Sequence, residues 1–156
     1  MSGILSRFTS LYHASSEKRH NRPFLEAAMA ACAIVSASEG EVTFSERIRV
    51  DQIMETLEKL KVFDPHEGVN LFNHFTDRII ASPKQGHEEA LSVIKVQAAD
   101  KETAELLINL CLAVSKSDGK ISLVEHIEIV SLCGLIDVDP EKIGLDTRQL
   151  FEQLTE

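Results

Sequence analysis

The sequence predicts an all-α fold, a single-domain bundle of about seven to eight helices with an internal pseudo-twofold repeat. Apolar residues recur at helical spacing along most of the chain, while strand runs and hairpin dipeptides are missing from it. One long pattern also occurs twice. With 156 residues, 44% of them hydrophobic, the chain is long enough to bury one core and fits one domain.

The duplicated pattern occupies residues 32–46 and 111–125. Each copy contains an apolar run, Ser-x-Ser, an acid–Gly pair, a β-branched residue, a hydroxyl residue and then a Glu. Residues 62–65 are echoed by residues 137–140 after a shorter interval. The repeat indicates that one structural unit is used in duplicate.

The first helix is predicted from an apolar stripe near the N-terminus, at spacing i, i+1, i+4, i+7 and i+8. The stripe consists of Ile4, Leu5, Phe8, Leu11 and Tyr12. Asn21-Arg22-Pro23 is expected to break this helix, because proline has no amide N–H to donate. We therefore expect an amphipathic N-terminal helix, residues 1–22, packed on the domain, and a helical domain spanning residues 23–156.

Two helices should lie at the centre of the bundle, because their sequences are apolar nearly all round. They span about residues 24–38 and 102–117. A helix of mixed polarity follows each acid–Gly pair, at about residues 44–60 and 123–133. These four segments contain both copies of the repeat.

The remaining helices are predicted from their start and stop signals. Asp64-Pro65-His66-Glu67 supplies an N-cap, a proline at the first helical position and an acid at the third, and Ser82-Pro83 ends that helix. Residues 88–99 form the next helix, and residues 146–154 form the last.

The net charge of −9 is distributed unevenly. Residues 1–22 carry four basic side chains and one acid, a net charge of +3, which leaves −12 for the rest of the chain. Nucleic acid is therefore excluded as a partner of the body, since its binding depends on basic groups that displace counterions. Divalent cations and basic protein surfaces fit this charge better.

Other classes of protein are excluded by missing signals. No stretch of apolar residues is long enough to span a membrane, and no secretory signal opens the chain. Cys32, Cys111 and Cys133 lie among aliphatic residues without Cys-x-x-Cys spacing, which indicates reduced, buried thiols in a cytoplasmic protein. Signatures of hydrolases, phosphate-binding loops and zinc proteases are missing too, so we expect no enzyme.

The acid–Gly segments have a purely structural interpretation. Thr43 to Glu46 and Ser122 to Glu125 both match the capping box, in which a hydroxyl and a Glu satisfy each other's backbone N–H groups. Gly40 and Gly119 fit the left-handed position just past a helix end. Local geometry alone can explain both segments.

The alternative is a shared metal site. The spacing of Gly, β-branched residue and Glu matches the second half of an EF-hand loop, but the early ligand positions are apolar or basic, so a true EF-hand is excluded. If the two turns pack together, Glu39, Glu46, Asp118 and Glu125 pool four carboxylates for one divalent cation, calcium or a similar ion. His126 is the one histidine near these acids, and we expect it to be a solvated surface residue.

The paired segments, each following an apolar helix in a wholly helical chain, resemble the TerB-like family of tellurite-resistance-associated proteins. The likeness covers about residues 23–140. It implies an all-helical domain with internal pseudo-symmetry, a cytoplasmic setting and a role in metal or oxidative stress responses. It also implies metal-chelating acids, which correspond here to Glu39, Glu46, Asp118 and Glu125, although Glu39 replaces the more usual Asp.

Two functions remain open at this point. One is a binding module of tellurite resistance or stress response with a divalent-cation site. The other is a scaffold for protein partners, at the membrane surface or away from it, in which the acid–Gly turns are only structural. The N-terminal helix fits either peripheral contact with an anionic membrane or packing on its own domain or on a second copy, as in a homodimer.

Overall fold

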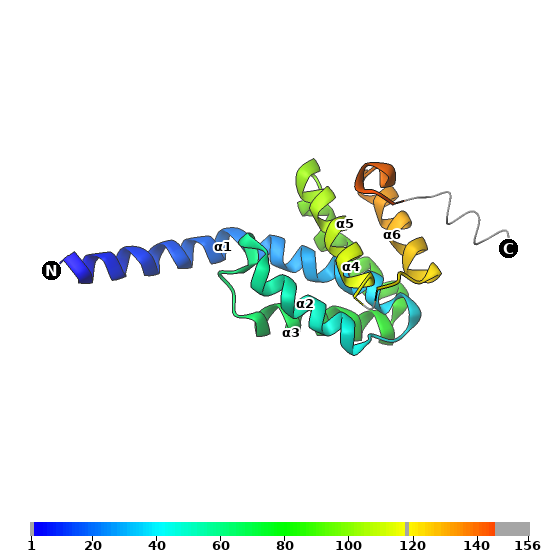
Figure 1. The fold of residues 1–156 in the computed structure, drawn as a ribbon, viewed down its shortest axis with the longest axis horizontal. Coiled ribbons are helices and arrows are strands. Elements are labelled where there is room, and N and C mark those ends of the chain that lie inside the picture. The colour runs from blue at the N-terminus through cyan, green and yellow to red at the C-terminus, as the bar shows by residue number, and fades with distance from the viewer. Residues whose placement is uncertain (1, 118, 146–156) are drawn as a thin grey trace.

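The computed structural model describes the backbone of residues 2–117 and 119–145 and the side chains of residues 3–7, 16–117 and 119–145. Its longest element is α1, Ser2–Ser36, which runs along the centre of the domain in its C-terminal half (Figure 1). From Phe24 to Ala37 nearly every residue is buried. Such burial on all sides of a helix requires neighbours all round it, and α3, α4, α5 and α6 all contact α1.

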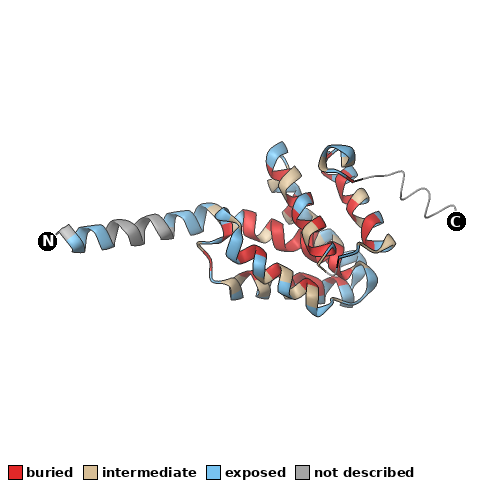
Figure 2. Ribbon diagram, in the orientation of Figure 1, coloured by how far each residue is buried: buried red, intermediate tan, exposed pale blue. Residues whose placement is uncertain are grey.

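The other elements surround α1 in chain order. They are the 3₁₀ turn Ala37–Glu39, α2 Phe44–Thr56, the 3₁₀ turn Glu58–Leu60, α3 Pro65–Ala81, α4 Pro83–Gln97, α5 Lys101–Ser115, α6 Leu123–Leu135 and the 3₁₀ turn Pro140–Ile143. No strand occurs among the described residues, which confirms the predicted all-α fold. Figure 2 shows the buried residues gathered where these helices meet.

The predicted break at Asn21-Arg22-Pro23 is wrong, because α1 continues through Pro23. Proline leaves the carbonyl of Arg19 without its helical partner. Arg19 is exposed, so water can bond that carbonyl. The ion pair between Arg22 and Glu26, with 3.3 Å between Nε and Oε1, spans the proline on the same helix.

The N-terminal part of α1 also differs from the expectation that it packs on the domain. Residues 3–7 and 16–20 are exposed, and Figure 1 shows this part of the helix projecting away from the other elements. Six α-helices occur in the described residues, because the first two expected helices form one helix and the last expected helix is not among these residues. The helix expected at residues 146–154 lies outside the described residues.

Helix starts mostly follow the predicted signals. Asp64 caps α3 in a complete capping box with Glu67. Ser82-Pro83 does more than end α3, because Pro83 itself opens α4 well before the expected residue 88. Gly86 then lets α4 approach the backbone of α3 closely, since a Cβ there would lie 2.6 Å from the Arg78 carbonyl oxygen.

Within residues 2–117 and 119–145, none of the helices combines the length and the hydropathy that crossing a bilayer requires.

Candidate functional site

The two acid–Gly segments have closely matching local conformations. Gly40 and Gly119 both adopt left-handed backbone angles, with φ of 83° and 89°. Thr43 and Ser122 then take extended N-cap conformations, with φ and ψ of −77° and 158° for Thr43 and −74° and 160° for Ser122. The predicted helix stops and starts are therefore confirmed in both segments, while the pseudo-twofold relation between the halves stays a prediction.

The cap of α2 uses one oxygen of Glu46. The Glu46 amide donates to Thr43 Oγ1 at 3.2 Å, and Glu46 Oε1 accepts from the Thr43 amide at 3.1 Å and from the Thr43 hydroxyl at 2.9 Å. This is a complete capping box, as predicted. All these bonds leave Glu46 Oε2 unused.

The cap of α6 repeats this arrangement in part. The Glu125 amide donates to Ser122 Oγ at 3.1 Å, and the Ser122 hydroxyl donates to Glu125 Oε1 at 3.2 Å. Glu125 is thus held at the start of α6 through one carboxylate oxygen, as Glu46 is held at the start of α2.

One cavity of about 290 Å³ joins the two segments. It is lined by Glu39, Thr43, Glu46, Ser115, Ser117, Lys120, Ile121, Ser122 and Glu125. Three of the four acids predicted to share a site, Glu39, Glu46 and Glu125, therefore meet in this pocket. The fourth, Asp118, lies outside the described residues.

Glu46 and Glu125 are buried in this pocket, with 5% and 8% of their surface exposed, whereas Glu39 lies at the exposed side. Among the described residues, neither Glu46 Oε2 nor Glu125 Oε2 has a hydrogen-bond partner. A buried carboxylate oxygen without a partner is costly, so the pair calls for a proton or a cation.

The surroundings of Glu125 favour its protonated form. Burial raises the pKa of Glu125 to about 7, and the negative charges of Glu46 and Glu39 raise it as well. The hydroxyls of Ser115 and Ser122 oppose this rise in pKa. Ser115 lies close enough to act on the carboxylate but makes no hydrogen bond of normal geometry within the described residues.

The sequence did not point to every residue of this pocket. Lys120 brings a positive charge to the same lining, and Ser115 adds a buried hydroxyl. Ser115 corresponds to Ser36 in the other copy of the repeat, and both are buried. The recurrence of Ser-x-Ser at matching positions of the repeat is the signal in the sequence that could have identified Ser115.

Two further observations bear on metal binding. Within residues 2–117 and 119–145, no group of three or more His, Cys, Asp and Glu side chains is arranged to hold a metal ion. His126, expected at the surface, is instead buried with 6% of its surface exposed. Ile129 on α6 is buried in the core, and His126 lies about one turn earlier on the same face of that helix.

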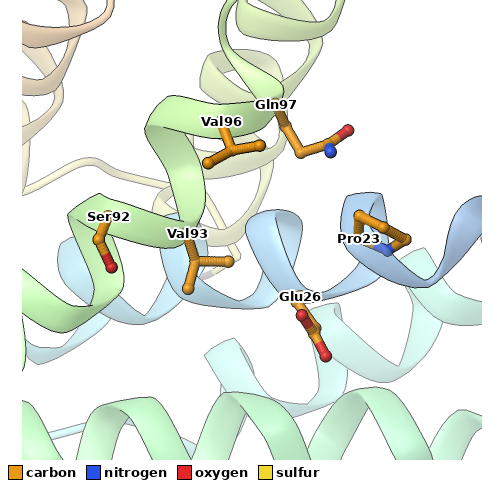
Figure 3. A pocket seen from close by; sticks show the side chains of 6 residues that line it. All are labelled: Pro23, Glu26, Ser92, Val93, Val96 and Gln97. Carbon is orange, nitrogen blue, oxygen red and sulfur yellow. The ribbon is translucent and has the colours of Figure 1, made fainter.

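A second hollow, also of about 290 Å³, lies between α1 and α4 (Figure 3). It is lined by Pro23, Glu26, Ser92, Val93, Val96 and Gln97. Glu26, the one charged side chain among its described lining residues, is already paired with Arg22. The described lining of this hollow offers no cluster of charged groups for an ion, so the acidic pocket is the better candidate site.

The sequence matches a known protein family. The chain fits the family model described as tellurite resistance protein TerB over residues 25–145. No curated protein and no solved structure matches it.

Proposed function

Because the chain belongs to the TerB family of tellurite resistance proteins, a non-catalytic family in general, we propose that it is a non-enzymatic binding module whose acidic pocket takes up a divalent cation. Glu46 and Glu125 supply the two inner carboxylate ligands. Glu39 acts from the exposed side through a water molecule, because no three acidic side chains among the described residues are arranged to hold an ion directly. Asp118, the acid of the second acid–Gly pair, lies outside the described residues and stays a ligand predicted from the sequence.

The single observation that carries this proposal is the pair of unused oxygens. In both Glu46 and Glu125, Oε1 accepts a hydrogen bond from the N-cap hydroxyl, while Oε2 is buried without a partner among the described residues. A cation between them would satisfy both oxygens and remove the repulsion between the two carboxylates.

The lining favours a hard cation such as calcium. Its described donors are carboxylate and hydroxyl oxygens, and neither histidine nor cysteine contributes to this lining. Calcium takes six to eight oxygen ligands in flexible geometry and accepts water in part of its shell. Zinc, which prefers nitrogen and sulfur, fits this lining less well.

The experiment is thermal melting of the full chain with calcium, magnesium, manganese or zinc at graded concentrations. An ion at a hundred times its dissociation constant stabilises the fold by about 2.7 kcal/mol. Glu125→Gln should abolish the shift, because Gln keeps the cap but lacks the charge. The melting temperature of the metal-free protein should not fall.

Glu67→Gln is the matched control. Glu67 closes the capping box of α3 through its Oε2, which accepts from the Asp64 amide at 3.1 Å, and it does not line the acidic pocket. This variant should keep the full ion-induced shift. An equal loss of the shift in both variants, or no shift for any ion in the wild type, would contradict the proposal.

A cytoplasmic setting is part of the proposal. Cys32, Cys111 and Cys133 are buried free thiols. The hydrogen bond with Cys32 and burial raise the pKa of Cys111 well above its usual value, and burial raises the pKa of Cys133 to about 11. Thiols held protonated in the core suit a reducing compartment.

A second candidate function is protein binding beside the pocket. Phe44, the first residue of α2, is 78% exposed directly after Thr43 of the pocket lining, and Val124 is exposed at the start of α6. Apolar side chains at such positions are suited to a partner surface. Phe44→Ser should then lower survival of tellurite-treated cells while the ion-induced melting shift stays unchanged. Unchanged survival would rule out this surface.

A further inference from the structure

We propose that the N-terminal arm, residues 2–22 of α1, docks on the surface of an anionic lipid bilayer. The proposal does not depend on the cation pocket, because none of the described side chains of the arm lines it. It starts from the position of the arm, which projects from the body of the domain (Figure 1). Twenty-one helical residues extend over about 30 Å, longer than the screening length of about 8 Å at physiological ionic strength.

The tip of the arm exposes large apolar side chains. Ile4 is 63% exposed and Leu5 is 71% exposed. In the sequence, Phe8, Leu11 and Tyr12 follow at helical spacing, which is the pattern of a helix that inserts one face into the boundary between headgroups and acyl chains.

The charge of the arm selects the kind of surface. Arg7, Lys18 and Arg19 are exposed on it, while the rest of the chain from residue 23 carries a net charge of −12. An anionic bilayer therefore attracts the arm and repels the body. Each basic residue near such a surface strengthens binding about fivefold.

A second copy of the chain suits this arm less well. Antiparallel pairing would place the apolar first half of one arm opposite Lys18 and Arg19 of the other. Parallel pairing would bring two strongly acidic bodies side by side. A lipid surface avoids both conflicts, since it offers anionic headgroups and an apolar interior at once.

Pro23 lets the arm lie along a surface while the body stands away from it. It occurs inside α1, where its ring nitrogen cannot bond the carbonyl of Arg19, and such sites are where long helices bend. The hollow shown in Figure 3 adjoins this proline, with Val96 exposed at its edge. Space for a bend is therefore present on the α4 side of the helix.

The experiment is sedimentation of the full chain with vesicles, in the presence of a chelator so that the cation pocket plays no part. One set contains phosphatidylcholine alone, and the other contains phosphatidylcholine mixed with phosphatidylserine. We expect binding to the anionic vesicles only, weakened by added salt. Lys18→Gln and Arg19→Gln should each weaken it about fivefold.

Ile4→Ser with Leu5→Ser should weaken binding about tenfold or more. Ile80→Ser removes an exposed apolar side chain on α3 and should bind as the wild type does. All variants should melt as the wild type does, because the substituted side chains are exposed. No binding to anionic vesicles, or equal binding by the Ile4/Leu5 variant, would overturn the proposal. So would self-association that depends on Ile4 and Leu5 without vesicle binding, which would assign the arm to a second copy.

Discussion

Glu46 and Glu125 occupy the same position in two different helices, the third residue of α2 and of α6, and both line one pocket. Each side chain therefore does two things at once. Its first oxygen closes the start of its own helix, and its second oxygen is buried where the two halves of the chain meet. Local helix capping thus places charges that interact over a long distance in the sequence.

The pKa of Glu125 predicts how the stability of the metal-free protein depends on pH. Between its usual value of 4.5 and about 7, the folded state holds the proton that the unfolded state has released. Unfolding then releases a proton, so the contribution of Glu125 to the free energy of unfolding falls as pH rises through this window. Above about pH 7 that contribution stays constant.

The measurement is urea denaturation with a chelator across this pH window, for the wild type and for Glu125→Gln. Other carboxyl groups titrate as well, so the difference between the two proteins isolates Glu125. The free energy of unfolding of the wild type should fall relative to that of Glu125→Gln as pH rises from 4.5 to about 7. A difference that is constant with pH would show that Glu125 titrates alike in both states.

The cap of α2 predicts a stability change at Thr43. Thr43→Ala removes the acceptor of the Glu46 amide and one donor to Glu46 Oε1, so it should lower the free energy of unfolding by about 1 kcal/mol. Thr43→Ser should nearly preserve it. Thr56→Ala is the control, because that hydroxyl donates to the Gln52 carbonyl at the exposed end of the same helix and takes no part in the cap. Urea denaturation compares the three, and equal losses at both sites would contradict the cap.

The close approach of α3 and α4 predicts opposite effects of one substitution at two glycines. At Gly86 a Cβ would lie 2.6 Å from the Arg78 carbonyl oxygen and from Ile79 Cα, so Gly86→Ala should cost about 1–3 kcal/mol. At Gly134, inside α6, no atom of the described residues lies within 4 Å of a Cβ. Gly134→Ala should stabilise the protein by about 0.5–1 kcal/mol. Thermal melting of both variants tests the pair. A neutral or stabilising Gly86→Ala would contradict the close approach of α3 and α4, and destabilisation by Gly134→Ala would contradict the open space at that position.

The helical fold followed from the sequence because its local signals agree with burial. Asp64-Pro65, Thr43 and Ser122 start helices as predicted. The helix break predicted at Pro23 was wrong because the effect of proline depends on its surroundings. The turns after Pro23 are buried and stabilise the helix, and Arg19, whose carbonyl loses its partner, is exposed to water. No local signal distinguishes that situation from a helix end.

The site was predictable only in part for a similar reason. The repeat indicated which acids belong together, and the pocket does unite Glu39, Glu46 and Glu125. It could not indicate that Glu46 and Glu125 are buried, or that His126 is buried too, because burial depends on how helices pack against one another. Lys120 in the lining had no signal in the sequence beyond its place next to Gly119.

The most direct test of the shared pocket is calcium titration by calorimetry of the wild type, Glu46→Gln and Glu125→Gln. A single site per chain that both substitutions weaken strongly is the result we predict, since one ion lies between the two carboxylates. Two independent sites, or a site that only one of the substitutions affects, would show that the acid–Gly segments do not hold an ion together.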